Sequence, residues 1–390
     1  MDREFDIIIH GATGFTGQLA MEHLLSVYGV NGNLKWAIAG RDLTKLQAVR
    51  TKAGAPADLS IIVADAHDAS ALAAMARRAK VIAAMAGPYV HYGSEIVAAC
   101  AASGADCVDI AGESHWMHAM LKHEPAAKAS GARIVFSCGF DSIPFEFGVF
   151  FLQEAAKTKF GAPLPRISSR VRRLERGVRG GMSGGSLATI MASIAAMREN
   201  PAIAPLLANP FALTPGFKGP EQPDALTAYE DNLVGSWVAP FVMAPINAKS
   251  VHRANYLMGH VWGTDFKYDE MMMVDGPPSG GAPPSVFQDA ANPPAPGEGP
   301  SKADREGGRY EILLYGQAED GSVLRARVNG DMDPGAGSTA RMAGESAVCL
   351  ARDITRDETP GGMWTPASAM GHTLLKRLQA DAGLSFQLEV

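Results

Sequence analysis

Three glycines spaced three residues apart form the first segment that could do chemistry. They lie in Gly11-Ala-Thr-Gly14-Phe-Thr-Gly17, directly after the apolar run Phe5–His10 and before a stretch of helical period. Between a strand and a helix, such glycines allow a tight turn, a close approach of backbone to a pyrophosphate, and close helix packing, while the helix N-terminus favours the anion. The pattern predicts a dinucleotide site, and the alternative is a purely structural turn. The predicted contacts are Gly11, Thr13, Gly14, Phe15, Thr16 and Gly17.

The second apolar run indicates which dinucleotide binds. Enzymes that use NAD place an acidic residue at the end of this strand, on the ribose hydroxyls. Here the run ends in Ala39-Gly40-Arg41-Asp42. A guanidinium suits a 2′-phosphate because it donates paired hydrogen bonds. We therefore expect NADP(H) rather than NAD(H), with Arg41 on the phosphate, Lys45 assisting, and Asp42 as the N-cap of the next helix.

Residues at two further strand ends are predicted to contact the same dinucleotide. Asp65 follows the third apolar run, where it either bonds the adenine amine or simply caps a helix. Ala86, Gly87 and Pro88 end the fourth run, and their small size lets the middle of the cofactor pass.

Reduction also needs a proton donor or a group that polarises the substrate. Ligands in open α/β sheets bind beyond the carboxyl ends of the strands. Tyr89 and Tyr92 follow the fourth strand and are the predicted donors. The predicted substrate contacts are His91, Glu113 and Asp141, and His115 and Ser142 are further candidates at the same strand ends. Each of these residues could instead only hold its loop.

A second glycine-rich segment spans Gly180 to Gly185 and leads into a helical stretch. One interpretation is a turn whose helix N-terminus presents Ser183 and Ser186 to the nicotinamide or the substrate. The other is an ordinary capped turn. No histidine or cysteine spacing indicates a metal site.

Alternating strands and helices must position these residues, and this alternation predicts βαβ units in a parallel sheet. We expect a Rossmann domain over residues 1–150. The predicted strands are Phe5–His10, Lys35–Ala39, Ser60–Ala64, Val81–Met85, Asp106–Ile110 and Arg133–Ser137. The predicted helices are Gln18–Tyr28, Leu43–Ala53, Ser70–Arg77, Ser94–Ser103 and Glu124–Ser130.

Beyond residue 150 the pattern changes to that of an α+β domain with an antiparallel sheet, expected over residues 151–355. Ser186–Arg198 and Ser338–Arg352 predict helices. Tyr310–Gln317 and Val323–Asn329 predict a hairpin around Asp320-Gly321. His260–Val274 predicts a strand pair or one long bent strand, and residues 276–308, rich in Pro and Gly, predict a mobile loop. Residues 356–390 predict a helix and a strand that return to the Rossmann domain.

Composition excludes several classes of protein. The 390 residues carry a net charge of −6, which argues against a nucleic-acid partner. We find neither a signal peptide nor an apolar run long enough for a transmembrane segment. The four cysteines form no CxxC pair and indicate buried thiols of a cytoplasmic protein. Charged residues make up 19% of the chain, against about 25% in typical domains. We therefore expect exposed apolar surface for an apolar ligand, a partner or peripheral membrane contact.

Several motifs in order carry a family resemblance. They are Gly11–Gly17, Ala39–Arg41, Gly87–Gly93, Asp109–Glu113 and Gly139–Pro144. Together the motifs resemble the saccharopine dehydrogenase-like oxidoreductases, in particular the trans-acting enoyl reductases.

The resemblance implies an N-terminal domain that binds NADP(H), a second domain that closes over the substrate, and a homodimer. It also implies that Gly112 lies against the cofactor. The implied reaction is reduction of a polarised C=C bond in an acyl or lipid-like substrate. Alternatives are imine reduction or amine oxidation of the saccharopine type, and a non-catalytic scaffold that binds NADP(H).

Overall fold

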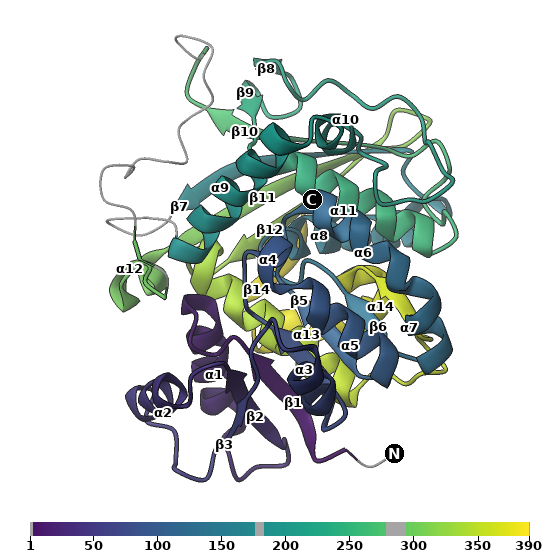
Figure 1. Cartoon of the computed structure of the whole chain (residues 1–390). Coiled ribbons are helices and arrows are strands. Elements are labelled where there is room, and N and C mark those ends of the chain that lie inside the picture. The colour runs from purple at the N-terminus through teal and green to yellow at the C-terminus, as the bar shows by residue number, and fades with distance from the viewer. Residues whose placement is uncertain (1–2, 176–182, 278–293, 296, 390) are drawn as a thin grey trace.

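The computed structural model describes residues 3–175, 183–277, 294–295 and 297–389 of the chain. These residues form two seven-stranded sheets with their helices. The parallel sheet lies in the lower half of Figure 1 and the mixed sheet in its upper half.

The first sheet is parallel throughout and has the strand order β13-β6-β5-β4-β1-β2-β3. Its interior strand β1 contains Ile7, Ile8 and Ile9, all fully buried, because helices cover both faces of the sheet. This arrangement confirms the predicted Rossmann fold. The strands are β1 (Phe5–His10), β2 (Trp36–Gly40), β3 (Ser60–Val63), β4 (Ala79–Ala84), β5 (Asp106–Asp109), β6 (Arg133–Val135) and β13 (Gly362–Trp364).

The helices that connect these strands are α1 (Phe15–Tyr28), α2 (Leu43–Lys52), α3 (Ala69–Ala76), α4 (Tyr89–Tyr92), α5 (Ser94–Ser103), α6 (Ser114–Met120), the 3₁₀ turn η1 (Leu121–His123) and α7 (Glu124–Ser130). Of these, α1, α2, α3, α5 and α7 follow the predicted segments closely, whereas α4, α6 and η1 were not predicted. Helices α3, α5 and α7 pack side by side, whereas α1 packs against a helix from much later in the chain.

The second sheet has the order β14-β12-β11-β7-β10-β9-β8. Its neighbouring strands are antiparallel except for β10 and β7, which run parallel, so it is a mixed sheet. The hairpin around Gly321 forms as predicted. The strands are β7 (Arg166–Glu175), β8 (Tyr229–Asp231), β9 (Ser236–Pro240), β10 (Lys267–Val274), β11 (Arg309–Gln317), β12 (Val323–Gly330) and β14 (Leu384–Glu389).

The remaining helices come after β6 in sequence. They are α8 (Ile143–Phe160), α9 (Gly184–Glu199), α10 (Ile203–Ala208), α11 (Ala244–Leu257), α12 (Lys302–Gly307), the π-helical turn η2 (Pro334–Ser338), α13 (Thr339–Arg352) and α14 (Pro366–Ala380). No helix among the described residues is long and apolar enough to cross a membrane.

Three segments differ from the sequence expectation. In His260–Val274 only β10 is a strand, because His260 and Gly263 adopt positive φ and form a turn. Helix α13 packs on β1, β4 and β5 of the parallel sheet, although we expected it in the second domain. The final strand, β14, pairs with β12 rather than returning to the Rossmann sheet, whereas β13 does join that sheet beside β6. The predicted mobile loop 276–308 lies largely outside the described residues, and its described end contains α12.

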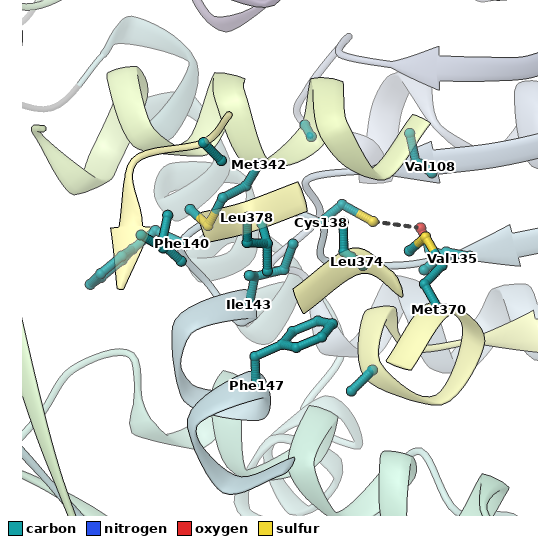
Figure 2. Packing of buried hydrophobic residues seen from close by; sticks show 14 of the residues in the cluster. Val108, Val135, Cys138, Phe140, Ile143, Phe147, Met342, Met370, Leu374 and Leu378 are labelled. Carbon is teal, nitrogen blue, oxygen red and sulfur yellow. Dashed lines mark hydrogen bonds between the residues drawn. The ribbon is translucent and has the colours of Figure 1, made fainter. Parts of the chain in front are cut away.

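One continuous apolar core joins the helices behind the two sheets. Figure 2 shows Cys138, Ile143 and Phe147 packed against Met342 of α13 and Leu374 of α14. The Cys138–Ile143 segment comes directly after β6, so this core holds the carboxyl end of that strand in place.

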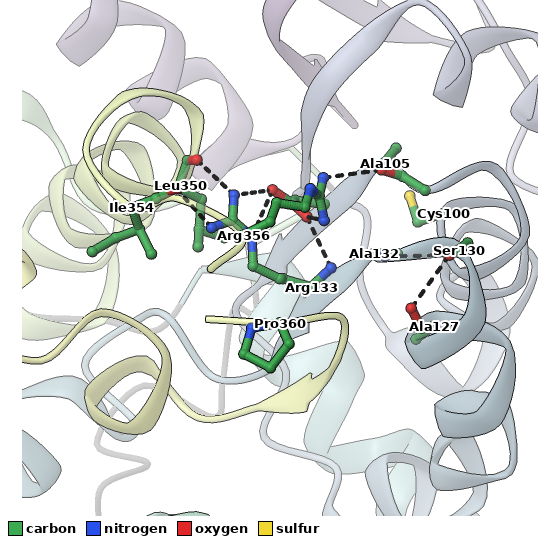
Figure 3. A network of polar contacts seen from close by, with 12 residues as sticks. Cys100, Ala105, Ala127, Ser130, Ala132, Arg133, Leu350, Ile354, Arg356 and Pro360 are labelled. Carbon is green, nitrogen blue, oxygen red and sulfur yellow. Dashed lines mark hydrogen bonds and ion pairs between the residues drawn. The ribbon is translucent and has the colours of Figure 1, made fainter. Parts of the chain in front are cut away.

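A buried polar network fixes the opposite, amino-terminal end of β6 and its neighbour β5 (Figure 3). Arg133 of β6 binds Asp106 of β5 and donates to the carbonyl oxygens of Leu350 and Ile354, each at 2.8 Å. Arg356 lies 3.0 Å from the other Asp106 oxygen. The network therefore ties the segment after α13 to the parallel sheet.

Candidate functional site

A cavity of about 1090 Å³ lies at the carboxyl ends of the parallel strands. The chain runs from β1 outward to β2 and β3 on one side and to β4, β5 and β6 on the other, so the cavity occupies the switch point where α/β proteins bind ligands. Its volume reaches the upper end of the usual range for one ligand, roughly 1,000 Å³, which leaves room for a dinucleotide and a second molecule.

The glycine-rich turn forms one wall of the cavity and fits a pyrophosphate. Gly11 has φ +87°, and a Cβ there would lie 2.7 Å from the backbone nitrogen of Ala86. Gly17 does not border the cavity; a Cβ there would lie 2.3 Å from the Gly11 oxygen, so this glycine allows helix α1 to pack on the turn. Gly14 is the N-cap of α1 and borders the cavity without any side chain, which leaves the helix N-terminus open to an anion. Thr13, Phe15 and Thr16 also border it.

The end of β2 presents two cations to the same cavity. Arg41 and Lys45 both border it, and Arg41 is exposed and forms no ion pair within the described part of the chain. Asp42 accepts a hydrogen bond from the Lys45 backbone N–H at 3.0 Å, which confirms it as the N-cap of α2. Two unpaired cations beside an exposed helix start suit a phosphate group.

The side of the cavity near β3 contains Asp65 and Tyr92. Asp65 accepts from the His67 backbone N–H at 2.9 Å and borders the cavity, while Asp68, not Asp65, caps α3. The ring of Tyr92 lies 5.4 Å from the ring of His67. Tyr92 therefore lies near the strand where the adenosine half of a dinucleotide is expected. His91, the neighbouring substrate candidate, is exposed and does not border the cavity.

Tyr89 is a buried link between strand ends. Its hydroxyl donates to the Ala84 carbonyl oxygen at 2.6 Å and accepts from the Ile110 backbone N–H at 3.0 Å. Burial, with Asp109 nearby, raises the pKa of Tyr89 well above its usual value. Because its proton is already committed to a backbone carbonyl, the geometry does not favour Tyr89 as a donor to substrate. The preceding residues Ala86, Gly87 and Pro88 border the cavity.

Glu113 is a buried carboxyl that joins three segments. It accepts from the backbone N–H groups of Tyr89 at 2.8 Å and Gly112 at 3.1 Å, and it is hydrogen-bonded to the Thr189 side chain of α9. Burial raises its pKa. Gly112 and Glu113 both border the cavity. Glu113 therefore connects the loop after β5 to α9.

Asp141 borders the cavity after β6, and its neighbour Ser142 joins that loop to the second domain. The Ser142 hydroxyl bonds the hydroxyl of Ser250 on α11 at 3.0 Å. The peptide bond between Asp141 and Ser142 is cis.

Ser183 and Ser186 form a capped helix start at the edge of the cavity. The Ser183 hydroxyl accepts from the Ser186 backbone N–H at 3.2 Å, and the two hydroxyls lie 3.1 Å apart. Both residues also border the cavity. The two interpretations from the sequence, a capped turn and a helix start that faces a ligand, are therefore compatible. Residues 180–182 of the predicted glycine-rich segment lie outside the described residues.

Helices α9 and α11 supply an apolar wall opposite the nucleotide side. The wall residues on α9 recur at helical spacing, one face turned to the cavity. They and their neighbours are Ile190, Ile194, Met197, Leu207, Val242, Met243 and Ile246.

Two nitrogen-bearing side chains lie in this region: His115 was a candidate from the sequence, whereas Lys249 was not among the predicted site residues. His115 borders the cavity with both ring nitrogens buried and without a hydrogen-bond partner among the described residues, and burial lowers its pKa. Lys249 borders it from α11 and is 1% exposed. His115 follows a predicted strand end, so its position was visible in the sequence. Lys249 had no such signal, because only the packing of α10 and α11 brings it to the cavity.

Comparisons with known proteins agree with this geometry. Residues 7–135 match the family model described as the saccharopine dehydrogenase NADP binding domain. A Mycobacterium tuberculosis protein with the provisional name of trans-acting enoyl reductase is 37% identical over 99% of this chain and 97% of its own length. The trans-acting enoyl reductase of Mycobacterium ulcerans is 35% identical over 96% of both chains. The apo saccharopine dehydrogenase (L-Glu forming) of Saccharomyces cerevisiae shares the fold, with a TM-score of 0.57 at 15% identity over 99% of this chain and all of the other.

Proposed function

The chain belongs to the trans-acting enoyl reductases, NADP(H)-dependent oxidoreductases with a saccharopine dehydrogenase-like fold, and from this premise we propose that its cavity reduces a polarised C=C bond of an acyl substrate. When bound, NADPH supplies the hydride for that reduction. The turn Gly11–Thr16 would hold the pyrophosphate, Arg41 and Lys45 the 2′-phosphate, and Asp65 the adenosine side.

The observation that carries this proposal is the apolar wall beside the dinucleotide crevice. Ile190, Ile194 and Met197 border the cavity from α9, and Val242 and Ile246 border it at the start of α11. An acyl chain is stabilised there by about 0.8 kcal/mol for each methylene group that it buries.

A saccharopine-type adduct fits this wall less well, because its carboxylates would need several cations. Among the described residues that border the cavity, Arg41, Lys45 and Lys249 are the lysines and arginines, and the first two lie at the nucleotide end. The described substrate side thus offers one such cation.

Loss of NADPH absorbance with a panel of acceptors tests the proposal. The panel contains trans-2-octenoyl thioester, octanal, and an imine formed from an amino acid and a keto acid. We expect NADPH consumption with the enoyl thioester and its saturated thioester as product. Turnover confined to the imine would contradict the proposal.

We also propose that the protein acts in the cytoplasm as a homodimer that touches membrane surfaces only peripherally. All four cysteines are free and buried, as suits a reducing compartment. Leu388 exposes an apolar side chain on β14, the edge strand of the mixed sheet, and this edge is our candidate dimer contact. Light scattering should give twice the chain mass, and Leu388→Lys should give the monomer mass.

A further inference from the structure

We propose that Lys249 is a catalytic residue whose ammonium group binds the carbonyl oxygen of the substrate and stabilises the negative charge that develops there. This inference rests on the proposed enoyl reduction. It assigns the chemistry of the substrate side of the cavity, where neither predicted tyrosine is placed to act.

The position of Lys249 is fixed by two hydrogen bonds to backbone. Its Nζ donates to the carbonyl oxygen of Leu207, in the last turn of α10, at 2.6 Å and to that of Pro245, one turn earlier on α11, at 2.8 Å. An ammonium group has three donors. Two are held by protein, and the side chain borders the cavity, so the third donor is available to a ligand.

The charge of Lys249 is not neutralised by the part of the protein that the structure describes. The residue is 1% exposed, yet no carboxylate among the described residues lies within ion-pair distance of its Nζ. Burial lowers its pKa to about 8. Buried charges are normally paired, because an unpaired ion in a low dielectric is costly. An anionic ligand would supply the missing partner.

No other described ionisable group near this wall supplies the negative charge that would pair with the Lys249 ammonium. Glu113 is held by the backbone of Tyr89 and Gly112 and by Thr189, and His115 carries no negative charge. Met243 and Ile246 are apolar residues that border the same cavity at the start of α11, and by excluding water they strengthen the field of the Lys249 ammonium.

Enoyl reduction produces an anion of the required kind. Hydride supplied by bound NADPH, which would leave as NADP⁺, would form a C–H bond at the β-carbon, and the π pair of the C=C bond would shift to give an enolate oxygen. A solvent proton then forms the C–H bond at the α-carbon and the carbonyl is restored. The ammonium of Lys249 would bind the oxygen throughout, most tightly while it is an enolate.

The experiment compares Lys249→Met and Lys249→Arg with Lys376→Met, an exposed lysine on α14 that serves as the control. Binding of NADP⁺ by each variant verifies the fold. We expect Lys249→Met to lower kcat with octenoyl thioester about 100-fold, the usual effect of removing one such donor, with a smaller change in KM. Lys249→Arg should restore part of kcat, and Lys376→Met should match the unaltered protein.

A binding measurement separates this role from simple tethering of α10. Calorimetry with NADP⁺ present compares octanoate, whose carboxylate mimics the enolate oxygen, with neutral octanamide. The unaltered protein should prefer octanoate about tenfold or more, and Lys249→Met should lose that preference. An unchanged preference, or an unchanged kcat, would overturn the inference.

The same design distinguishes the two proposals. If the unaltered protein reduces octenoyl thioester and Lys249→Met does so equally well, only the role of Lys249 fails. If the unaltered protein reduces no enoyl thioester, the proposed function fails, and the ratio of octanoate to octanamide binding still decides whether Lys249 recognises an anion.

Discussion

At the residue scale, Arg41 is the residue that we propose to set the cofactor preference. It follows β2 and borders the cavity with Lys45. Hydrogen bonds to a charged group contribute about 1.5–3 kcal/mol, so Arg41→Ala should weaken NADPH binding at least about tenfold and leave NADH binding nearly unchanged. Fluorescence titration with both nucleotides measures this. Lys52→Ala, on α2 but away from the cavity, is the matched control, and equal losses for both nucleotides would contradict the assignment.

Tyr89 gives a second prediction at this scale. Its hydroxyl joins the Ala84 carbonyl oxygen to the Ile110 backbone N–H, so Tyr89→Phe leaves a buried donor without a partner. The free energy of unfolding should fall by about 1–3 kcal/mol, and kcat should remain within about threefold. Urea unfolding and steady-state rates measure both. A fall in kcat of about 100-fold with unchanged stability would restore Tyr89 as the proton donor.

The sequence predicted local geometry where residues close in the chain decide it. The glycines of the first turn and the N-cap Asp42 depend on neighbours within a few residues. The environment of Tyr89 and Lys249 depends on strands and helices distant in sequence, namely β5 for Tyr89 and α10 for Lys249. No local pattern reports such contacts.

At the scale of elements, α9 sets the width of the proposed acyl site. Ile194 faces the cavity, whereas Met191 on the same helix is 58% exposed. Ile194→Trp should fill part of the cavity, raise KM for long enoyl thioesters about tenfold, and leave a four-carbon enoyl thioester almost unaffected. Met191→Trp is the control for helix stability. Equal effects on the long and short substrates would place the acyl chain elsewhere.

Hydrophobic patterning predicts helices and strands but does not predict which sheet each of them joins. Patterning correctly predicted α13, β12 and β14 as elements. It could not predict that α13 covers the parallel sheet while β14 joins the mixed one. That choice follows from buried contacts far apart in sequence, such as the 2.8 Å contact between His23 of α1 and Glu345 of α13.

At the scale of the whole molecule, buried carboxyls make stability depend on pH. Burial raises the pKa of Glu146 to about 8 from a usual value of 4.5. The folded state therefore keeps a proton that the unfolded chain releases. The stabilisation linked to this proton is complete below about pH 4.5 and is lost as pH rises toward about 8. Asp109 and Glu270, whose pKa values burial raises to about 7 and about 8, act in the same direction.

Glu146→Gln tests this linkage because glutamine keeps the shape and the acceptor for the Ala367 backbone N–H but cannot ionise. Urea midpoints of the variant should rise relative to those of the unaltered protein between about pH 5 and about pH 8. A constant difference between the two proteins over that range would show that Glu146 does not titrate in this way.

Isotope tracing tests the central claim, reduction of an enoyl C=C bond in the cavity, most directly. The enzyme would be incubated with octenoyl thioester and NADPH carrying deuterium at C4 of the nicotinamide, prepared separately for each face. NMR of the product should show one deuterium on the β-carbon with one cofactor isomer and none with the other. Deuterium at the carbonyl carbon, or no transfer to octenoyl thioester from either isomer, would contradict the account.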